Sequence, residues 1–228
     1  GNPLLGSADY KLAHHCKNGR TVYSFCMCPG GTVVAAASEP GKLVTNGMSQ
    51  YSRNERNANA AIVVDISPDD CPDGPLGGIA FQRELEQKAF ELGGSNYNAP
   101  CQLVGDFLKN KPSTTLGSVV PSYTPGVTPC NLAGALPDFA IEALREALPA
   151  FDKSIPGFSL YDAVLTGTET RTSSPVKILR DRENLQSVNI KGLYPAGEGA
   201  GYAGGILSSA VDGIEVAEAI ARDIAAGK

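Results

Sequence analysis

A glycine-dense stretch near the C-terminal end constrains the fold of this chain more than any other feature. Residues 192–213 read GLYPAGEGAGYAGGILSSAVDG. Glycine lets backbone N–H groups approach a ligand closely and permits a positive φ where a turn needs one. An apolar run before the turn and apolar residues at helical spacing after it predict a strand over 192–196, a tight turn, and a helix over 204–226 that buries a broad apolar face.

The turn also matches the letters of the dinucleotide fingerprint G-x-G-x-x-G, through Gly199, Gly201 and Gly204. That fingerprint requires a further strand with an acidic residue about 20 positions on, which holds the ribose. Here the predicted helix runs to Lys228, and Asp223, at about the right offset, lies inside it. We therefore expect a cofactor contact made by the last βα unit of a nucleotide-binding domain and not by its first. The alternative is a purely structural strand-to-helix turn.

The composition is that of an ordinary globular protein. The 228 residues are 42% hydrophobic and carry a formal net charge of -5, which argues against a nucleic-acid surface. No stretch approaches the roughly 20 consecutive apolar residues of a membrane span. The 6 cysteines contain no C-x-x-C pair and favour a reduced, cytoplasmic compartment over a disulfide-rich secreted one.

The first part of the chain reads as β-rich. Residues 20–28 and 32–37 are strand-like runs joined by Pro29-Gly30-Gly31, which predicts a hairpin, and residues 60–66 predict a third strand. The polar residues 46–59 are either a solvated loop or a loop that contacts substrate, because planar hydrogen-bond donors are concentrated there between strands. The candidate substrate contacts in this segment are Ser49, Arg53 and Asn59.

The later part alternates helical and irregular segments. Residues 81–92 and 136–148 have the apolar spacing of packed helices, and residues 176–179 and 185–190 predict a second hairpin. We expect two domains. Residues 1–160 contain the first strands and both packed helices, and residues 161–228 form a closing segment.

Two cysteines are candidates for chemistry. Cys26 and Cys28 lie two apart on a predicted strand, so their thiols are expected to be neighbours on one face. A disulfide between them would be strained, and a metal ion would need further ligands. His14, His15 and Cys16 would supply them, but their spacing is not that of a zinc site. We expect no metal, and the pair is either packed on the strand or has a catalytic, redox or substrate-contacting role.

Residues 169–175 (ETRTSSP) place Glu169 and Arg171 among hydroxyl groups. An arginine is usually a surface charge, but one amid hydroxyls can bind a carboxylate or phosphate, so both residues are candidate substrate contacts. The 2 histidines are adjacent and no G-x-S-x-G elbow is present, which argues against a Ser-His-Asp hydrolase.

These segments together resemble a known family. Residues 189–213 are similar to the C-terminal FAD-contacting segment of flavoproteins with two dinucleotide-binding folds, in which Ala-Gly-Asp or Ala-Gly-Glu ends a short strand. The resemblance is closest to the C-terminal portion of bacterial uncharacterised FAD-dependent dehydrogenases, a glutathione-reductase-like branch. It extends to residues 23–31, 46–64 and 169–175.

The resemblance implies a fold class and a cofactor site. The fold is α/β with α+β character: a β-rich cap or substrate domain, followed by the C-terminal strands and last helix of an FAD-binding domain. Glu198 is implied to hydrogen-bond the ribityl chain of FAD, and the N–H groups at the start of the last helix to face the pyrimidine edge of the flavin. The implied cofactor contacts are Gly197, Glu198, Gly199, Gly204, Gly205 and Ile206.

The N-terminal G-x-G-x-x-G unit of such flavoproteins has no counterpart before residue 192. We therefore expect a piece of a longer FAD-dependent oxidoreductase that passes a hydride or electron pair to or from a small-molecule substrate. The expected partner of this chain is the missing N-terminal FAD-binding part. Without that part, we expect the chain to be inactive and to bind FAD weakly or not at all. Two other functions stay open: a non-catalytic ligand-binding or scaffolding module, and a thiol-dependent redox protein using Cys26 and Cys28.

Overall fold

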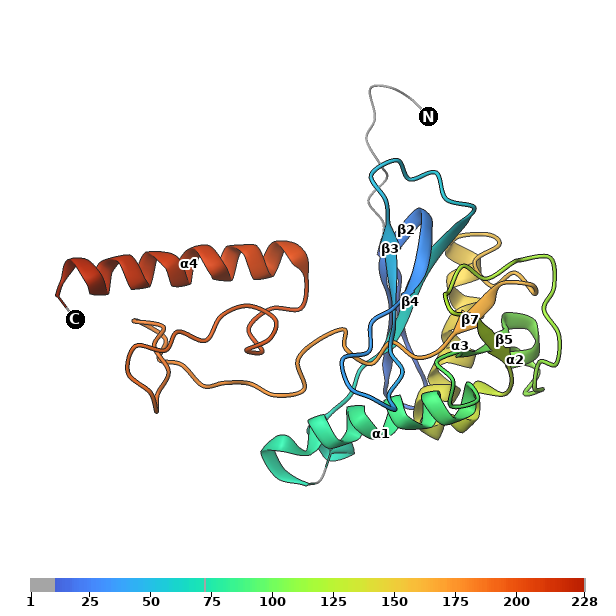
Figure 1. Ribbon diagram of the computed structural model, residues 1–228, viewed down its shortest axis with the longest axis horizontal. Helices are drawn as coiled ribbons and strands as arrows, with labels where there is room; N and C mark the ends of the chain where they lie inside the picture. Colours follow the sequence, from blue (N-terminus) through green and yellow to red (C-terminus); the bar gives the residue numbers. More distant parts are fainter. Residues whose placement is uncertain (1–10, 72, 228) are drawn as a thin grey trace. The chain divides into compact units, whose positions relative to one another are not determined.

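The computed structural model describes residues 11–71 and 73–227 (Figure 1). The chain divides into two compact units. One contains the chain up to Ser67 together with Arg83–Thr170, and the other contains Pro68–Gln82 together with the chain from Arg171 onward. Among the described residues, no helix is both long and apolar enough to cross a membrane.

The first unit is built on a four-stranded antiparallel sheet. Its strands are β1 (Ala13–His15), β2 (Thr21–Ala35), β3 (Thr45–Ser49) and β4 (Asn57–Val64). The long strand β2 is central, since β1 pairs with its beginning, β3 with its end and β4 with most of its length. The polar segment 46–59 is therefore only partly a loop: its two ends belong to β3 and β4.

The expected hairpin at Pro29-Gly30-Gly31 is wrong, because these residues lie inside β2. The register between β2 and β4 shifts twice, between Phe25 and Cys28 and between Cys28 and Gly31. Each shift is a β-bulge, which takes up an extra residue without ending the strand. Gly30 allows the strand to bend, because its φ of 57° is one that glycine adopts readily. Gly31 is already paired with both β3 and β4.

The first unit contains a second, three-stranded sheet in the order β6-β5-β7. Its strands are β5 (Ala99–Leu103), β6 (Val127–Pro129) and β7 (Val164–Thr166). β5 pairs in parallel with β6 and antiparallel with β7. Every residue of β5 is buried, as expected for the central strand of a mixed sheet covered on both faces.

The two helices predicted over 81–92 and 136–148 are confirmed as α1 (Gly77–Leu92) and α3 (Asp138–Ser154). One face of α3 packs Ala143, Ala147 and Phe151 against Val22 of the first sheet. Another side of α3 packs Ile141 and Leu148 against the short helix α2 (Val104–Leu108), which follows β5. The helix therefore shares apolar contacts with both parts of the unit, and Figure 1 shows it beside their strands. Three short 3-10 turns complete this list: η1 (Pro68–Asp70), η2 (Gly74–Leu76) and η3 (Leu132–Gly134).

The second unit consists of irregular chain followed by the helix α4 (Ile206–Ala225), which confirms the predicted last helix. The strands expected over 176–179, 185–190 and 192–196 are wrong, since the only ladder contact within residues 171–205 is one isolated bridge, Arg180 to Ser187. Two backbone hydrogen bonds flank this bridge, from the Asp181 N–H to the Gln186 carbonyl at 2.8 Å and from the Val188 N–H to the Leu179 carbonyl at 3.2 Å, and side chains bind N–H groups in the adjoining turns. Asp181 Oδ1 accepts two backbone N–H groups, and Gln186 Oε1 accepts the Gly192 N–H. With two sheets and long helices, the fold class is mixed α/β, as expected.

Candidate functional site

The bulged part of β2 gathers several residues that the sequence marks as candidates. The Cys28 thiol lies there and donates to the Cys26 carbonyl at 3.3 Å. Ser49 Oγ donates to the Pro29 carbonyl at 3.3 Å, and a Cβ on Gly30 would lie only 2.1 Å from the Arg53 carbonyl oxygen. The loop between β3 and β4 is thus folded directly onto the bulge, and Ser49 and Arg53 also line an open depression in that loop.

Asn59 lies across the same part of the sheet, in space that two glycines leave open. A Cβ on Gly47 would lie 2.2 Å from Asn59 Oδ1, and a Cβ on Gly31 would lie 2.8 Å from Asn59 Nδ2 and 2.3 Å from the Met48 carbonyl oxygen. Both polar atoms of the Asn59 amide are buried and have no hydrogen-bond partner among the described residues. A buried amide without partners costs about 1–3 kcal/mol for each polar group, so this arrangement calls for a partner beyond the described residues.

The segment that follows β7 brings two more polar groups to this region. The Thr45 N–H of β3 donates to the Thr168 carbonyl at 3.0 Å. Thr168 is only 4% exposed, and its hydroxyl also has no partner among the described residues. Next to it, burial raises the pKa of the Glu169 carboxyl. We call Cys28, Asn59, Thr168 and Glu169 the bulge cluster.

Electrostatics connect two members of the bulge cluster, Cys28 and Glu169. The pKa of the Cys28 thiol is raised, first by burial and second by the negative charge of Glu169. A thiol with a raised pKa is a poor nucleophile at neutral pH, and a carboxyl with a raised pKa keeps its proton to a higher pH than an exposed one does. The cluster therefore combines such a carboxyl with the buried polar groups of Asn59 and Thr168, which have no partner among the described residues.

The other candidates of the first unit lie nearby but are exposed. Cys26 is exposed and has a φ of 46°. The bulge interrupts the alternation of side chains along β2, so the argument that placed the thiols of Cys26 and Cys28 on one face does not apply. Arg171 belongs to the second unit. No local pattern pointed to Glu86, a fully buried side chain of α1 that accepts a hydrogen bond from Thr170 Oγ1 at 2.9 Å.

The glycine turn of the second unit is held by a buried ion pair. Asp212 of α4 accepts the Gly197 N–H at 2.7 Å and pairs with both terminal nitrogens of Arg180. Arg180 also donates to the Pro195 carbonyl at 2.7 Å and stacks on the Tyr202 ring at 3.7 Å. The two charged side chains are 8% and 9% exposed. The Arg180 hydrogen bonds hold the pKa of Asp212 below its ordinary value.

Sequence reasoning missed both members of this pair. The signal was present in α4, whose buried residues are Asp212, Val216 and Ala219, at positions i, i+4 and i+7. A single aspartate on such a stripe indicates a buried partner. The broad apolar face that the sequence predicted is instead exposed here, with Ile206 at 84% and Leu207 at 83%.

The predicted cofactor contacts divide into three groups. Gly197 has a φ of 65° and is required by the turn itself. Gly199 and Gly204 have no described atom within 4 Å of an added Cβ, and Gly205 has only Ser208 Oγ at 3.8 Å. Glu198 and Ile206 are exposed. Packing within the second unit therefore does not explain the three glycines 199, 204 and 205, and the backbone around the start of α4 is open to a ligand.

A sequence model of the family described as FAD-dependent protein, C-terminal domain-like, matches residues 1–172. The chain belongs to this family. The bulge cluster lies inside the part matched by the FAD-dependent C-terminal domain family, whereas the glycine turn and α4 follow it. A curated relative from Clostridium beijerinckii, described as an uncharacterized protein, is 58% identical over 221 residues, or 96% of this chain. The chain spans 41% of that relative's length.

Proposed function

We propose that this chain supplies the substrate-binding part and the flavin-facing closing turn of an FAD-dependent oxidoreductase acting on a small molecule. Membership of a family described as FAD-dependent supports the cofactor. The observation that carries the assignment of the turn is the open backbone at Gly199, Gly204 and Gly205, where the fold itself has no need of glycine.

The turn fits one edge of a flavin. Gly205 is the N-cap of a helix of 20 residues, so the first N–H groups of α4 have no partners within the helix and lie at the positive end of its dipole. Such groups stabilise negative charge that develops on a bound ring. When bound, FAD supplies the capacity to accept or donate a hydride or an electron pair. The exposed Glu198 carboxylate would accept hydrogen bonds from the ribityl hydroxyls, and the rest of the contact would come from Gly197, Gly199, Gly204, Gly205 and Ile206.

The bulge cluster is the proposed substrate-side site. The Asn59 amide offers one donor and one acceptor group, the Thr168 hydroxyl offers either, and Glu169 holds or accepts a proton. The raised pKa of Glu169 lets its carboxyl donate a proton at a higher pH than an exposed glutamate would. Ser49 and Arg53 are the more peripheral proposed contacts of this site. Arg171, in the second unit, is a separate proposed substrate contact, because a guanidinium can bind an acidic group.

The test uses two glycine-to-alanine changes in the gene product that carries this sequence. Gly204→Ala and Gly213→Ala both place a Cβ where no described atom lies within 4 Å, so neither strains the chain. We expect Gly204→Ala to lower FAD affinity at least tenfold and Gly213→Ala to leave it unchanged, measured by flavin fluorescence titration. Equal FAD affinity in the two variants would contradict the assignment of the turn.

The raised pKa of Cys28 disfavours the thiol-dependent alternative, because a redox thiol needs a thiolate at working pH. A non-catalytic binding module would use the same unpaired groups of Asn59 and Thr168. Bleaching of the flavin by a substrate in the gene product, and its loss in Glu169→Gln, would separate an oxidoreductase from such a module.

A further inference from the structure

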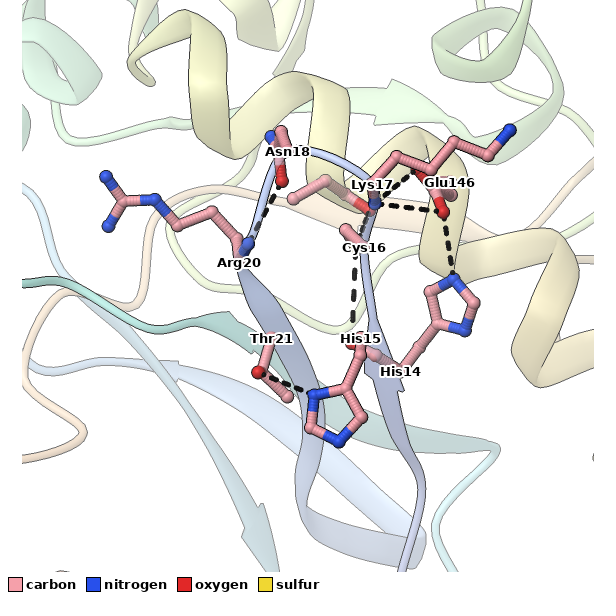
Figure 2. A network of polar contacts seen from close by, with 9 residues as sticks. His14, His15, Cys16, Lys17, Asn18, Arg20, Thr21 and Glu146 are labelled. Atoms are coloured by element: carbon pink, nitrogen blue, oxygen red, sulfur yellow. Dashed lines mark hydrogen bonds and ion pairs between the residues drawn. The ribbon is translucent and has the colours of Figure 1, made fainter.

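A second group of polar side chains lies away from the bulge cluster, where β1 meets α3 (Figure 2). His14 and Cys16 are two residues apart in an extended segment, so their side chains face the same side. Glu146 of α3, distant in the sequence, faces them, with 3.3 Å between His14 Nε2 and Glu146 Oε1. Within the described part of the chain, one ligand atom from each of the three residues lies within 4.8 Å of the others. His15 points elsewhere, to Thr21 Oγ1 at 3.0 Å.

We propose that His14 Nε2, Cys16 Sγ and a Glu146 carboxylate oxygen form a binding site for a borderline-soft divalent cation, for which Zn²⁺ is the best match. Imidazole, thiolate and carboxylate are the three ligand types that Zn²⁺ takes in proteins. Harder cations such as Mg²⁺ and Ca²⁺ prefer oxygen alone, so a thiolate and an imidazole select against them. Three protein ligands leave a fourth position of the tetrahedron for water.

The distances suit this ion after a small adjustment. Zn²⁺ binds nitrogen and oxygen at about 2.0–2.2 Å and sulfur at about 2.3 Å, which places pairs of tetrahedral ligand atoms roughly 3.3–3.6 Å apart. The separation of His14 Nε2 and Glu146 Oε1, 3.3 Å, already has this value. The longest separation in the cluster is up to 4.8 Å. Rotation of the Cys16 side chain away from the Ala143 carbonyl, which its thiol contacts at 3.5 Å, would close it.

The backbone holds the carboxylate in place. The Lys17 N–H donates to Glu146 Oε1 at 3.3 Å and Oε2 at 3.2 Å, as Figure 2 shows. When one oxygen binds the metal, the other keeps this hydrogen bond, and Lys17 becomes an outer contact that orients the ligand. The His14 and Glu146 side chains are 29% and 30% exposed, so the ion and its water have a path to solvent.

Charge in the cluster also favours a cation. The Glu146 carboxylate and a Cys16 thiolate together offer two negative charges to a divalent cation, and the imidazole offers Nε2, the nitrogen that faces Glu146. The thiol proton leaves to solvent when the metal binds. Affinity should consequently increase with pH, because the deprotonated sulfur is the ligand.

The experiment titrates the chelator-treated chain with Zn²⁺ by calorimetry and with Co²⁺ by absorption spectroscopy. We expect one equivalent of Zn²⁺ to bind, with release of protons. Co²⁺ should give a sulfur-to-cobalt charge-transfer band in the near ultraviolet and visible bands typical of tetrahedral coordination. Absence of Zn²⁺ binding in calorimetry, or Co²⁺ spectra without the charge-transfer band, would overturn the proposal.

Variants locate the site. Cys16→Ser should abolish the charge-transfer band, and Glu146→Gln should lower Zn²⁺ affinity at least tenfold while its amide oxygen still accepts the Lys17 N–H. The matched control is Cys26→Ser, which removes an exposed thiol and should leave both signals intact. A band that survives Cys16→Ser, or that disappears in Cys26→Ser, would place the metal elsewhere and overturn the proposal. Because Cys16 is 7% exposed, circular dichroism is used to check that the Cys16→Ser variant folds. If it does not fold, the Zn²⁺ affinity of Glu146→Gln tests the site instead, and an unchanged affinity would overturn the proposal.

Discussion

Replacing Asp212 by asparagine should open the glycine turn, because Asp212 carries the charge that balances Arg180. Both side chains are almost completely buried, at 8% and 9% exposure. Asparagine keeps the shape of aspartate and one acceptor oxygen, but it leaves the guanidinium in the interior without a counter-charge. Removing one partner of a buried ion pair costs about 3–5 kcal/mol. Because the amide oxygen of asparagine retains some hydrogen bonds, we expect the lower end of this range.

The reporter is backbone hydrogen exchange in peptides covering residues 196–212. The Gly197 N–H is bonded to Asp212 itself, and the N–H groups of Gly201 and Tyr202 close the turn on Glu198 and Gly197. A loss of about 3 kcal/mol corresponds to a factor of roughly 10² in local opening, since each 1.36 kcal/mol is a factor of ten. Exchange in this peptide should accelerate by that factor, read by mass spectrometry.

The control is Glu218→Gln, which removes a charge from an exposed position of the same helix and should change exchange little. Acceleration below tenfold in Asp212→Asn, or equal acceleration in Glu218→Gln, would refute the assignment of the pair as the support of the turn.

Acid should act on the same contact. The pKa of Asp212 in the folded chain is below its unfolded value of about 3.9. Its contribution to stability is therefore complete above the unfolded pKa and is lost as pH falls through the folded pKa. Exchange of residues 196–212, corrected for its intrinsic pH dependence, should be constant at neutral pH and accelerate below about pH 4. An onset near pH 6 would indicate a different group.

Three further results are expected. Alkylation of Cys28, followed by mass spectrometry, should be slow at neutral pH and faster in Glu169→Gln, because the Glu169 charge contributes to the raised pKa of the thiol. An unchanged alkylation rate would show that the Glu169 charge does not act on the Cys28 thiol. Gly47→Ala should destabilise the first unit in urea unfolding by about 1–3 kcal/mol, since its Cβ would lie 2.2 Å from Asn59 Oδ1. The control Gly134→Ala should change stability less, because the nearest described atom to its Cβ lies at an ordinary contact distance of 3.6 Å. The chain of 228 residues alone should bind FAD weakly or not at all, and stoichiometric flavin in the purified chain would contradict this.

Local patterns determined the elements whose signals lie within a few residues. The helical spacing of apolar residues predicted α1, α3 and α4, because a helix of 16 to 20 residues presents several turns of the same periodicity. The β-branched run over 60–66 predicted most of β4. The glycine-dense stretch was predicted to be a turn before α4. The resemblance of the sequence to FAD-dependent proteins agrees with the family whose model it matches.

The tertiary structure decided what depends on residues distant in the sequence. Pro29-Gly30-Gly31 is equally compatible with a reversal or a bulge, and the pairing of Gly31 with both β3 and β4 selects the bulge. The pairing expected over residues 176–190 is reduced to the Arg180–Ser187 bridge, and the Asp181 and Gln186 side chains bind the N–H groups of Glu183 and Gly192 in the adjoining turns. Apolar spacing likewise located α4 but not its buried face, which the Arg180–Asp212 pair sets.

The same division holds for the sites. The sequence named Cys28, Asn59 and Glu169 one by one from their residue types and local surroundings, but only the folded sheet brings them to one place. It could not indicate that His14 and Cys16 face Glu146, 132 positions from His14. Periodicity and turn chemistry act between neighbours in the chain and can be read from letters, whereas burial, unpaired polar groups and ligand geometry arise when distant segments exclude water together.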